Sequence, residues 1–151
     1  ALTDPRVSDE LPPFDRPTLY SETVAFAGNL FGAATPAPGK SPTQMIANAP
    51  ALVSPHGAPQ WIKIGLANAT PGDATIVLFS LSKATGSPVL LGDPVFVDAG
   101  PIVGDEGFAT YHQPAPLHSS LIGTKLFFQW VSGEPGNESW SNGAELTPFG
   151  Y

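Results

Sequence analysis

The sequence predicts an all-β protein, a single antiparallel β-sandwich of immunoglobulin-like or jelly-roll-like type, with an extended N-terminal arm. Proline and glycine make up more than a fifth of the 151 residues, which disfavours long helices and favours short strands joined by turns. In the second half of the chain, turn signals recur at the spacing of about 8–12 residues that is typical of sandwiches. An apolar fraction of 42% is enough to build the core of one domain.

The composition divides the chain near residue 56. Residues 1–55 hold nine of the 18 prolines and are predicted to be an extended, proline-rich arm, whereas residues 56–151 are predicted to form the sandwich domain. Within the arm, the weak alternation of Thr18–Phe26 predicts a strand, and residues 33–42 are typical of a loop. Residues 44–53 are compatible with a strand or an irregular segment.

The domain carries a series of short apolar segments. Alternation predicts a half-buried strand at 62–66, and the segment 75–81, apolar on both faces, predicts a central strand. The remaining predicted strands are 89–91, 95–98, 108–112, 125–131 and 144–149, and turns are expected at 71–73, 85–88, 92–94, 104–107 and 134–137.

The strongest strand signal is Leu126–Val131, in which Leu126, Phe128 and Trp130 share one face. We expect Gln129, on the opposite face, to pair with backbone at a sheet edge. The sequence Ser141-Asn142-Gly143 is expected to form the turn of the closing hairpin, because Asn-Gly tolerates the positive φ of a type I′ turn.

Charge and cysteine content narrow the classes of function. The net charge is −7, from 13 acidic and 6 basic residues, so the basic stripe that nucleic acid requires is absent from the sequence. No apolar stretch approaches the length of a membrane span. The absence of Cys excludes thiol nucleophiles and disulfides. Only 13% of residues are charged, and such a neutral surface favours contact with other surfaces.

The ionisable residues give no catalytic or metal-binding pattern, so we predict no enzyme, no cofactor and no metal. His56, His112 and His118 lack the spacing of a metal site. Acidic pairs that could hold Ca²⁺ between strands fit solvated turns better, since no repeated Asp-x-Asp spacing exists. These pairs are Asp9 with Glu10, Asp93 with Asp98, and Asp105 with Glu106. A Gly-x-Ser-x-Gly elbow is also absent from the sequence.

Three aromatic residues are candidates for stacking on sugars or for anchoring a protein contact: Trp61, Trp140 and Tyr151. Trp140 stands among Asn and Ser residues and is predicted to be the best exposed aromatic. Asn68 and Asn137 begin the acceptor sequons Asn-Ala-Thr and Asn-Glu-Ser, which mark them as candidate glycosylation sites.

From Ile62 to Gly150 the chain resembles a module common in exported proteins of planctomycetes and related bacteria. The similarity is carried by Asn68–Ala74, by Gly107-Phe108-Ala109, and by the closing segments Leu121–Val131 and Ser141–Leu146. It implies an extracellular β-sandwich with no assigned enzymatic activity, and it transfers no site residues. Some members carry Cys, whereas this chain has none, and residues 1–55 lie outside the similarity.

The favoured hypothesis is a secreted, non-enzymatic subunit that self-assembles into a fibre, tube or surface layer as a homo-oligomer or homopolymer. A start at Ala1 fits cleavage of a signal peptide. The arm would add a strand to the sheet of a neighbouring subunit. The arm residues expected to do so are Arg16, Leu19, Tyr20, Val24, Phe26, Leu30 and Phe31. The alternative is an adhesive surface module that binds polysaccharide.

Overall fold

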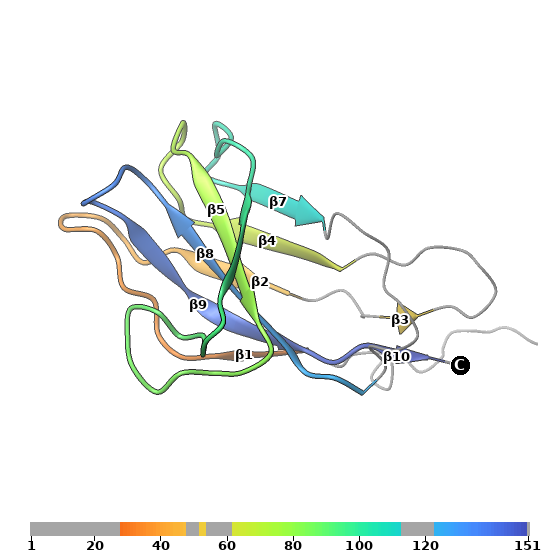
Figure 1. Ribbon diagram of the computed structural model, residues 1–151. Coiled ribbons are helices and arrows are strands. Elements are labelled where there is room, and N and C mark those ends of the chain that lie inside the picture. Colours follow the sequence, from red (N-terminus) through yellow and green to blue (C-terminus); the bar gives the residue numbers. More distant parts are fainter. Residues whose placement is uncertain (1–27, 48–51, 54–61, 113–122, 151) are drawn as a thin grey trace, which may run out of the picture.

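The computed structural model describes residues 28–47, 52–53, 62–112 and 123–150 (Figure 1). It confirms the all-β sandwich, and the described residues contain no helix. A five-stranded sheet and a three-stranded sheet form two layers that pack face to face, and their apolar inner faces make the main core.

The strands are β1 (Gly28–Phe31), β2 (Gln44–Ile46), β3 (Leu52–Val53), β4 (Lys63–Ala67), β5 (Thr75–Ser80), β6 (Phe96–Ala99), β7 (Ala109–His112), β8 (Leu126–Ser132), β9 (Ser139–Leu146) and β10 (Phe149–Gly150). The larger sheet has the order β1-β9-β8-β5-β6, and the smaller has the order β2-β4-β7. Both are antiparallel, whereas β10 pairs with β3 in a short parallel pair. The predicted segment 89–91 is not a strand; only Leu91 forms an isolated bridge, with Lys83.

Strand β8 lies at the centre of the larger sheet, and all seven of its residues are buried. Leu126, Phe128 and Trp130 point into the main core, where the Trp130 ring meets Tyr111 of β7 edge-on at 6.4 Å between centroids. Phe127 and Val131 point to the outer face and form a second apolar cluster with Leu78 and Leu91. The strongest predicted strand is therefore confirmed, and both of its faces are covered.

The outer face of β8 is covered by the connection between β5 and β6, residues 81–95, which Gln129 holds in place. The Gln129 Oε1 accepts the N–H of Leu90 at 3.0 Å, and Nε2 donates to the carbonyl oxygens of Pro88 and Ser141, each at 2.8 Å. The expectation that Gln129 pairs at a sheet edge is therefore wrong: it lies on the central strand and is fully buried. It satisfies backbone groups of a covering loop that would otherwise be buried without partners.

Replacing Gln129 with Leu is expected to lower the free energy of unfolding by about 2–4 kcal/mol, since the variant leaves three backbone groups of the covering loop and β9 unpaired. Urea denaturation followed by tryptophan fluorescence measures this. Gln44→Leu is the matched control, because Gln44 is exposed on β2 and its replacement should change stability by less than about 0.5 kcal/mol. Equal effects of the two substitutions would contradict the role of Gln129.

Residues 28–47, predicted as part of a separate arm, lie within the sandwich. Strand β1 pairs with β9, and the pairing continues at Thr35, which exchanges two 2.8 Å backbone hydrogen bonds with Trp140. Strand β2 then joins β4 in the other sheet. The sandwich thus begins no later than Gly28, and the predicted boundary at residue 56 is wrong. The sequence does not reveal these strands, because strands of three or four residues separated by Pro and Gly show too little alternation to be recognised.

The arm residues Leu30 and Phe31 pair with β9 of their own chain, opposite Ala144 and Gly143. This part of the predicted arm therefore adds a strand to the sheet of its own molecule. The other predicted arm residues lie outside the described part of the chain: Arg16, Leu19, Tyr20, Val24 and Phe26.

The predicted turn Ser141–Gly143 is wrong, because these residues lie in the middle of β9. The hairpin between β8 and β9 instead turns at 134–137, as also predicted, where Asn137 N–H donates to Glu134 C=O at 2.9 Å. Gly143 serves a packing role: it faces Phe31 across the strands, and a Cβ at this position would overlap the Phe31 ring.

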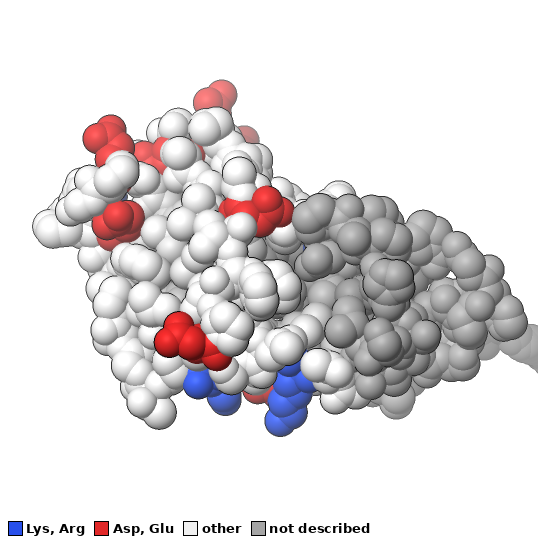
Figure 2. All heavy atoms as spheres, in the orientation of Figure 1, with Lys and Arg blue, Asp and Glu red and all other residues white. Residues whose placement is uncertain are grey.

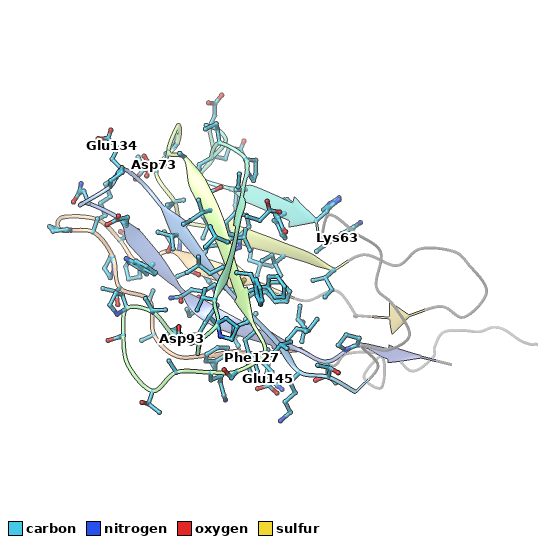
Figure 3. All side chains as sticks on the ribbon, viewed as in Figure 1. Lys63, Asp73, Asp93, Phe127, Glu134 and Glu145 are labelled. Carbon is cyan, nitrogen blue, oxygen red and sulfur yellow. The ribbon has the colours of Figure 1, made fainter. Side chains whose placement is uncertain are left out.

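Phe31 fills a socket over Gly143. Its ring meets Phe127 edge-on, with centroids 5.9 Å apart, and the Lys83 Nζ lies 5.1 Å from the Phe31 centroid. Lys83 also pairs with Glu145 at 3.7 Å, and Glu145 faces Phe127 across β8 and β9 (Figure 3). An aromatic ring over a strand glycine recovers the apolar contact that the glycine lacks, so this socket holds β1 on the sheet.

Gly143→Ala is expected to lower the free energy of unfolding by about 1–3 kcal/mol, because the added methyl group displaces the Phe31 ring. Chemical denaturation measures the loss, and in a Phe31→Ala background the same substitution should cost less. Gly86→Ala is the control, since no heavy atom lies within 4 Å of its Cβ position. If Gly143→Ala is as neutral as the control, the socket does not hold β1.

Candidate functional site

Each side of the sandwich is bounded by one edge strand from each sheet. On one side, the segment 28–47 pairs with β9 as β1 and crosses to the smaller sheet as β2, so that β1 and β2 are the edge strands there. There Met45 N–H donates to the Asn142 Oδ1 of β9 at 2.8 Å. On the other side, β6 and β7 are the edge strands of their sheets, and no strand of the described residues pairs with their outer edges. We call this second side the open side.

The β6 edge exposes apolar side chains and unpaired backbone. Phe96 is 49% exposed and Val97 is 63% exposed. Gly100 N–H donates to Thr75 C=O, and hydrogen bonding alternates along an antiparallel pair, so the N–H and C=O groups of Val97 and Ala99 point away from β5. An apolar edge with free backbone groups is a template for another strand.

Asp98 bridges the two sheets across the open side. It points inward from β6, and its Oδ2 accepts the hydroxyl of Tyr111 on β7 at 2.8 Å. Its Oδ1 accepts the N–H of Ala99 at 2.9 Å. Burial and the hydrogen bond to Asp98 raise the pKa of Tyr111 well above its usual range, which keeps the hydroxyl protonated. An inward-pointing charge is one of the devices by which proteins limit pairing at an edge strand.

Tyr111 gives the stability of the fold a pH dependence on the alkaline side. The folded chain holds the Tyr111 proton more tightly than the unfolded chain, whose pKa is 10.0, so the stabilisation is complete below pH 10 and falls as pH rises above it. Tyr111→Phe should lower the free energy of unfolding by about 1 kcal/mol at pH 7 and reduce its decline above pH 10. Urea denaturation across pH 7–11 tests this. Parallel curves for the two proteins would contradict it.

The loop that joins β6 to β7 extends the open side with further apolar side chains: Ile102 is 62% exposed and Phe108 is 53% exposed. The charged residues of the segment 93–108 are Asp93, Asp98, Asp105 and Glu106, and the sequence places no Lys or Arg between Lys83 and Lys125. The face of the molecule in Figure 2 is mostly uncharged, with separate acidic side chains around it and basic side chains at its lower edge. The open side is therefore apolar and weakly acidic.

The predicted contact aromatics do not form a sugar platform among the described residues. Trp140 lies on β9, half-buried against the outer cluster that contains Phe127 and Val131, and it is more exposed than Trp130 or Tyr111. Its neighbours Ser139 and Ser141 are buried and use their hydroxyl groups in hydrogen bonds. Trp61 and Tyr151 lie outside the described residues.

Both sequon asparagines are exposed: Asn68 follows β4 with a φ of 60°, and Asn137 ends the turn between β8 and β9. These positions are accessible to a modifying enzyme. Two shallow hollows of about 420 and 440 Å³ share Ser41 and Asn68 in their linings. The second hollow is also lined by the carboxylates of Asp105 and Glu106.

The acidic and histidine candidates remain separate in the described structure. No group of three or more His, Asp or Glu residues there could hold a metal ion. His112 is exposed at the end of β7, opposite Lys63 of β4, which Figure 3 labels. His56, His118, Asp9 and Glu10 lie outside the described residues.

The open side is not evident from the sequence. The segment 95–98 is predicted as a strand, but a strand's position at the edge depends on which partners it lacks. One available signal is Pro at both ends of the strand, Pro94 and Pro101, since Pro is common beside short edge strands.

No family model matches the chain, and comparisons with curated proteins and with solved structures find no similar protein. The resemblance to the exported module accordingly stays a prediction. No helix in the described residues has the length and apolarity needed to cross a membrane.

Proposed function

We propose that this protein is a secreted, non-enzymatic structural subunit that assembles with copies of itself into an extracellular fibre, tube or surface layer. In this proposal, residues 1–27 of each copy add a strand to the sheet of a neighbour. The extracellular location follows from the resemblance to exported modules.

The observation that carries the proposal is the exposed apolar edge that the larger sheet presents at β6. No strand of the described residues pairs with the outer edge of β6 or of β7, the two edge strands of the open side. The open side exposes Phe96, Val97, Ile102 and Phe108, all close to half exposed or more. A surface of this kind is stabilised by burial against another molecule.

The topology favours an open polymer over a closed dimer. Strand β1, which follows the arm directly, and strand β6 occupy opposite edges of the same five-stranded sheet. A contact that joins one edge of a subunit to the opposite edge of the next is head-to-tail. Such contacts continue from copy to copy unless the rotation between copies closes a ring.

Deleting residues 1–27 is expected to abolish assembly while leaving the sandwich folded, because β1 and its socket are retained. Light scattering coupled to size-exclusion chromatography and negative-stain electron microscopy measure assembly, and near-ultraviolet circular dichroism checks the fold. The full-length chain is the reference. A full-length chain that stays monomeric at high concentration, or a deletion variant that assembles equally well, would exclude the proposal.

The polysaccharide-binding alternative receives less support from the geometry. Its best candidate, Trp140, is half-buried and packs against the outer cluster, which reduces the ring area that a sugar could cover. The two shallow hollows also lack an aromatic lining residue.

A further inference from the structure

We propose that the acceptor in this assembly is the outer edge of β6, and that its occupant is the segment Thr18–Phe26 of a second copy. This inference rests on the proposed function and names the partner of the open side. It follows from three properties of β6: its backbone groups, its exposed side chains and its position in the sheet.

The backbone of β6 offers a short row of hydrogen-bonding groups. The N–H and C=O of Val97 and the C=O of Ala99 face away from β5, as the alternation from the Gly100–Thr75 hydrogen bond requires. The N–H of Ala99 is already occupied by the Asp98 Oδ1. Pairing therefore centres on Val97, and Asp98 must release Ala99 before the pairing can extend further along the strand.

The exposed side chains distinguish β6 from β7. On β6 the exposed groups are apolar, with Phe96 stacked on Phe79 at 5.1 Å and Val97 opposite the buried Leu78. On β7 the exposed residues are the polar Thr110 and His112. An incoming apolar strand gains more by covering β6, because burial removes the side chains of Phe96 and Val97 from water.

The donor segment has matching chemistry. In Thr18–Phe26, Tyr20, Val24 and Phe26 recur at even positions, so they would share one face of an added strand. Arg16 precedes the segment, and the open side supplies acidic residues without a Lys or Arg between positions 84 and 124. The segment also precedes β1 closely, and β1 lies at the edge opposite β6, which suits transfer to a neighbour's sheet.

The test compares two full-length variants that place the same charge on the two open edges. Val97→Lys should raise the concentration needed for assembly by about ten-fold or more, because it places an ammonium group where the donor's apolar residues would lie. Thr110→Lys, on the exposed face of β7, should stay within about two-fold of the wild type. Light scattering over a concentration series gives both values, and thermal unfolding confirms that each variant is folded.

The outcomes separate this inference from the proposed function. If the wild type assembles but Thr110→Lys prevents assembly and Val97→Lys does not, the acceptor is β7 and the assignment to β6 is overturned, while self-assembly stands. If the wild type never assembles, the proposed function fails first.

Amide hydrogen exchange of the wild type gives an independent readout. The Val97 amide should exchange quickly in the monomer and slowly in the assembly, since none of the described residues accepts its hydrogen bond within one chain and the added strand would. A Val97 amide that is slow to exchange in the monomer at every concentration would show that the edge is covered within one chain. That result would overturn pairing between copies.

Discussion

The structure depends on covering both faces of β8. All seven residues of this strand are buried, which a single two-layer sandwich cannot achieve, because each sheet of a sandwich has one face toward solvent. The smaller sheet covers the inner face, where Trp130 and Phe128 are nearly inaccessible. The connection 81–95 covers the outer face. Gln129, at the middle of the sheet, stabilises this connection by forming hydrogen bonds with the backbone of Leu90 and Pro88.

The same need to satisfy polar groups explains how the edges are treated. The β9 edge is closed by β1, and the close fit of Phe31 over Gly143 fixes the register of that pairing. The open side has a weaker closure, in which one carboxylate, that of Asp98, connects β6 to Tyr111 of β7. A hydrogen bond to a side chain can be exchanged for a backbone partner at little cost, whereas a filled aromatic socket cannot. The pairing of β1 with β9 is thus harder to exchange for a new partner than the contacts at the β6 edge.

The β6 edge offers a surface for contact in a chain whose described residues include no group of three or more His, Asp or Glu that could hold a metal ion. A low charge density reduces repulsion between copies, and exposed apolar side chains on the open side provide a gain on contact. The short length of β6, together with Pro94 and Pro101 at its ends, restricts pairing to a few residues. Such an edge suits a specific partner strand better than uncontrolled aggregation.

The sequence by itself determined the fold class, the strands with clear alternation or continuous apolar character, and the turns marked by Gly and Pro. Strands β4, β5, β7 and β8 and the turn at 134–137 were predicted correctly because their signals are local. Only the tertiary structure decided where Gly143 lies, whether Trp140 is covered, that residues 28–47 belong to the sandwich, and which edges stay open. These properties depend on residues distant in sequence. Gly143 is needed because the Phe31 ring packs over it, and Gln129 is buried because a loop about 40 residues away covers it. Strand β6 is an edge strand because no described strand pairs with its outer side. Local patterns record a residue's preference for a conformation, whereas burial and edge position are set by what packs against it.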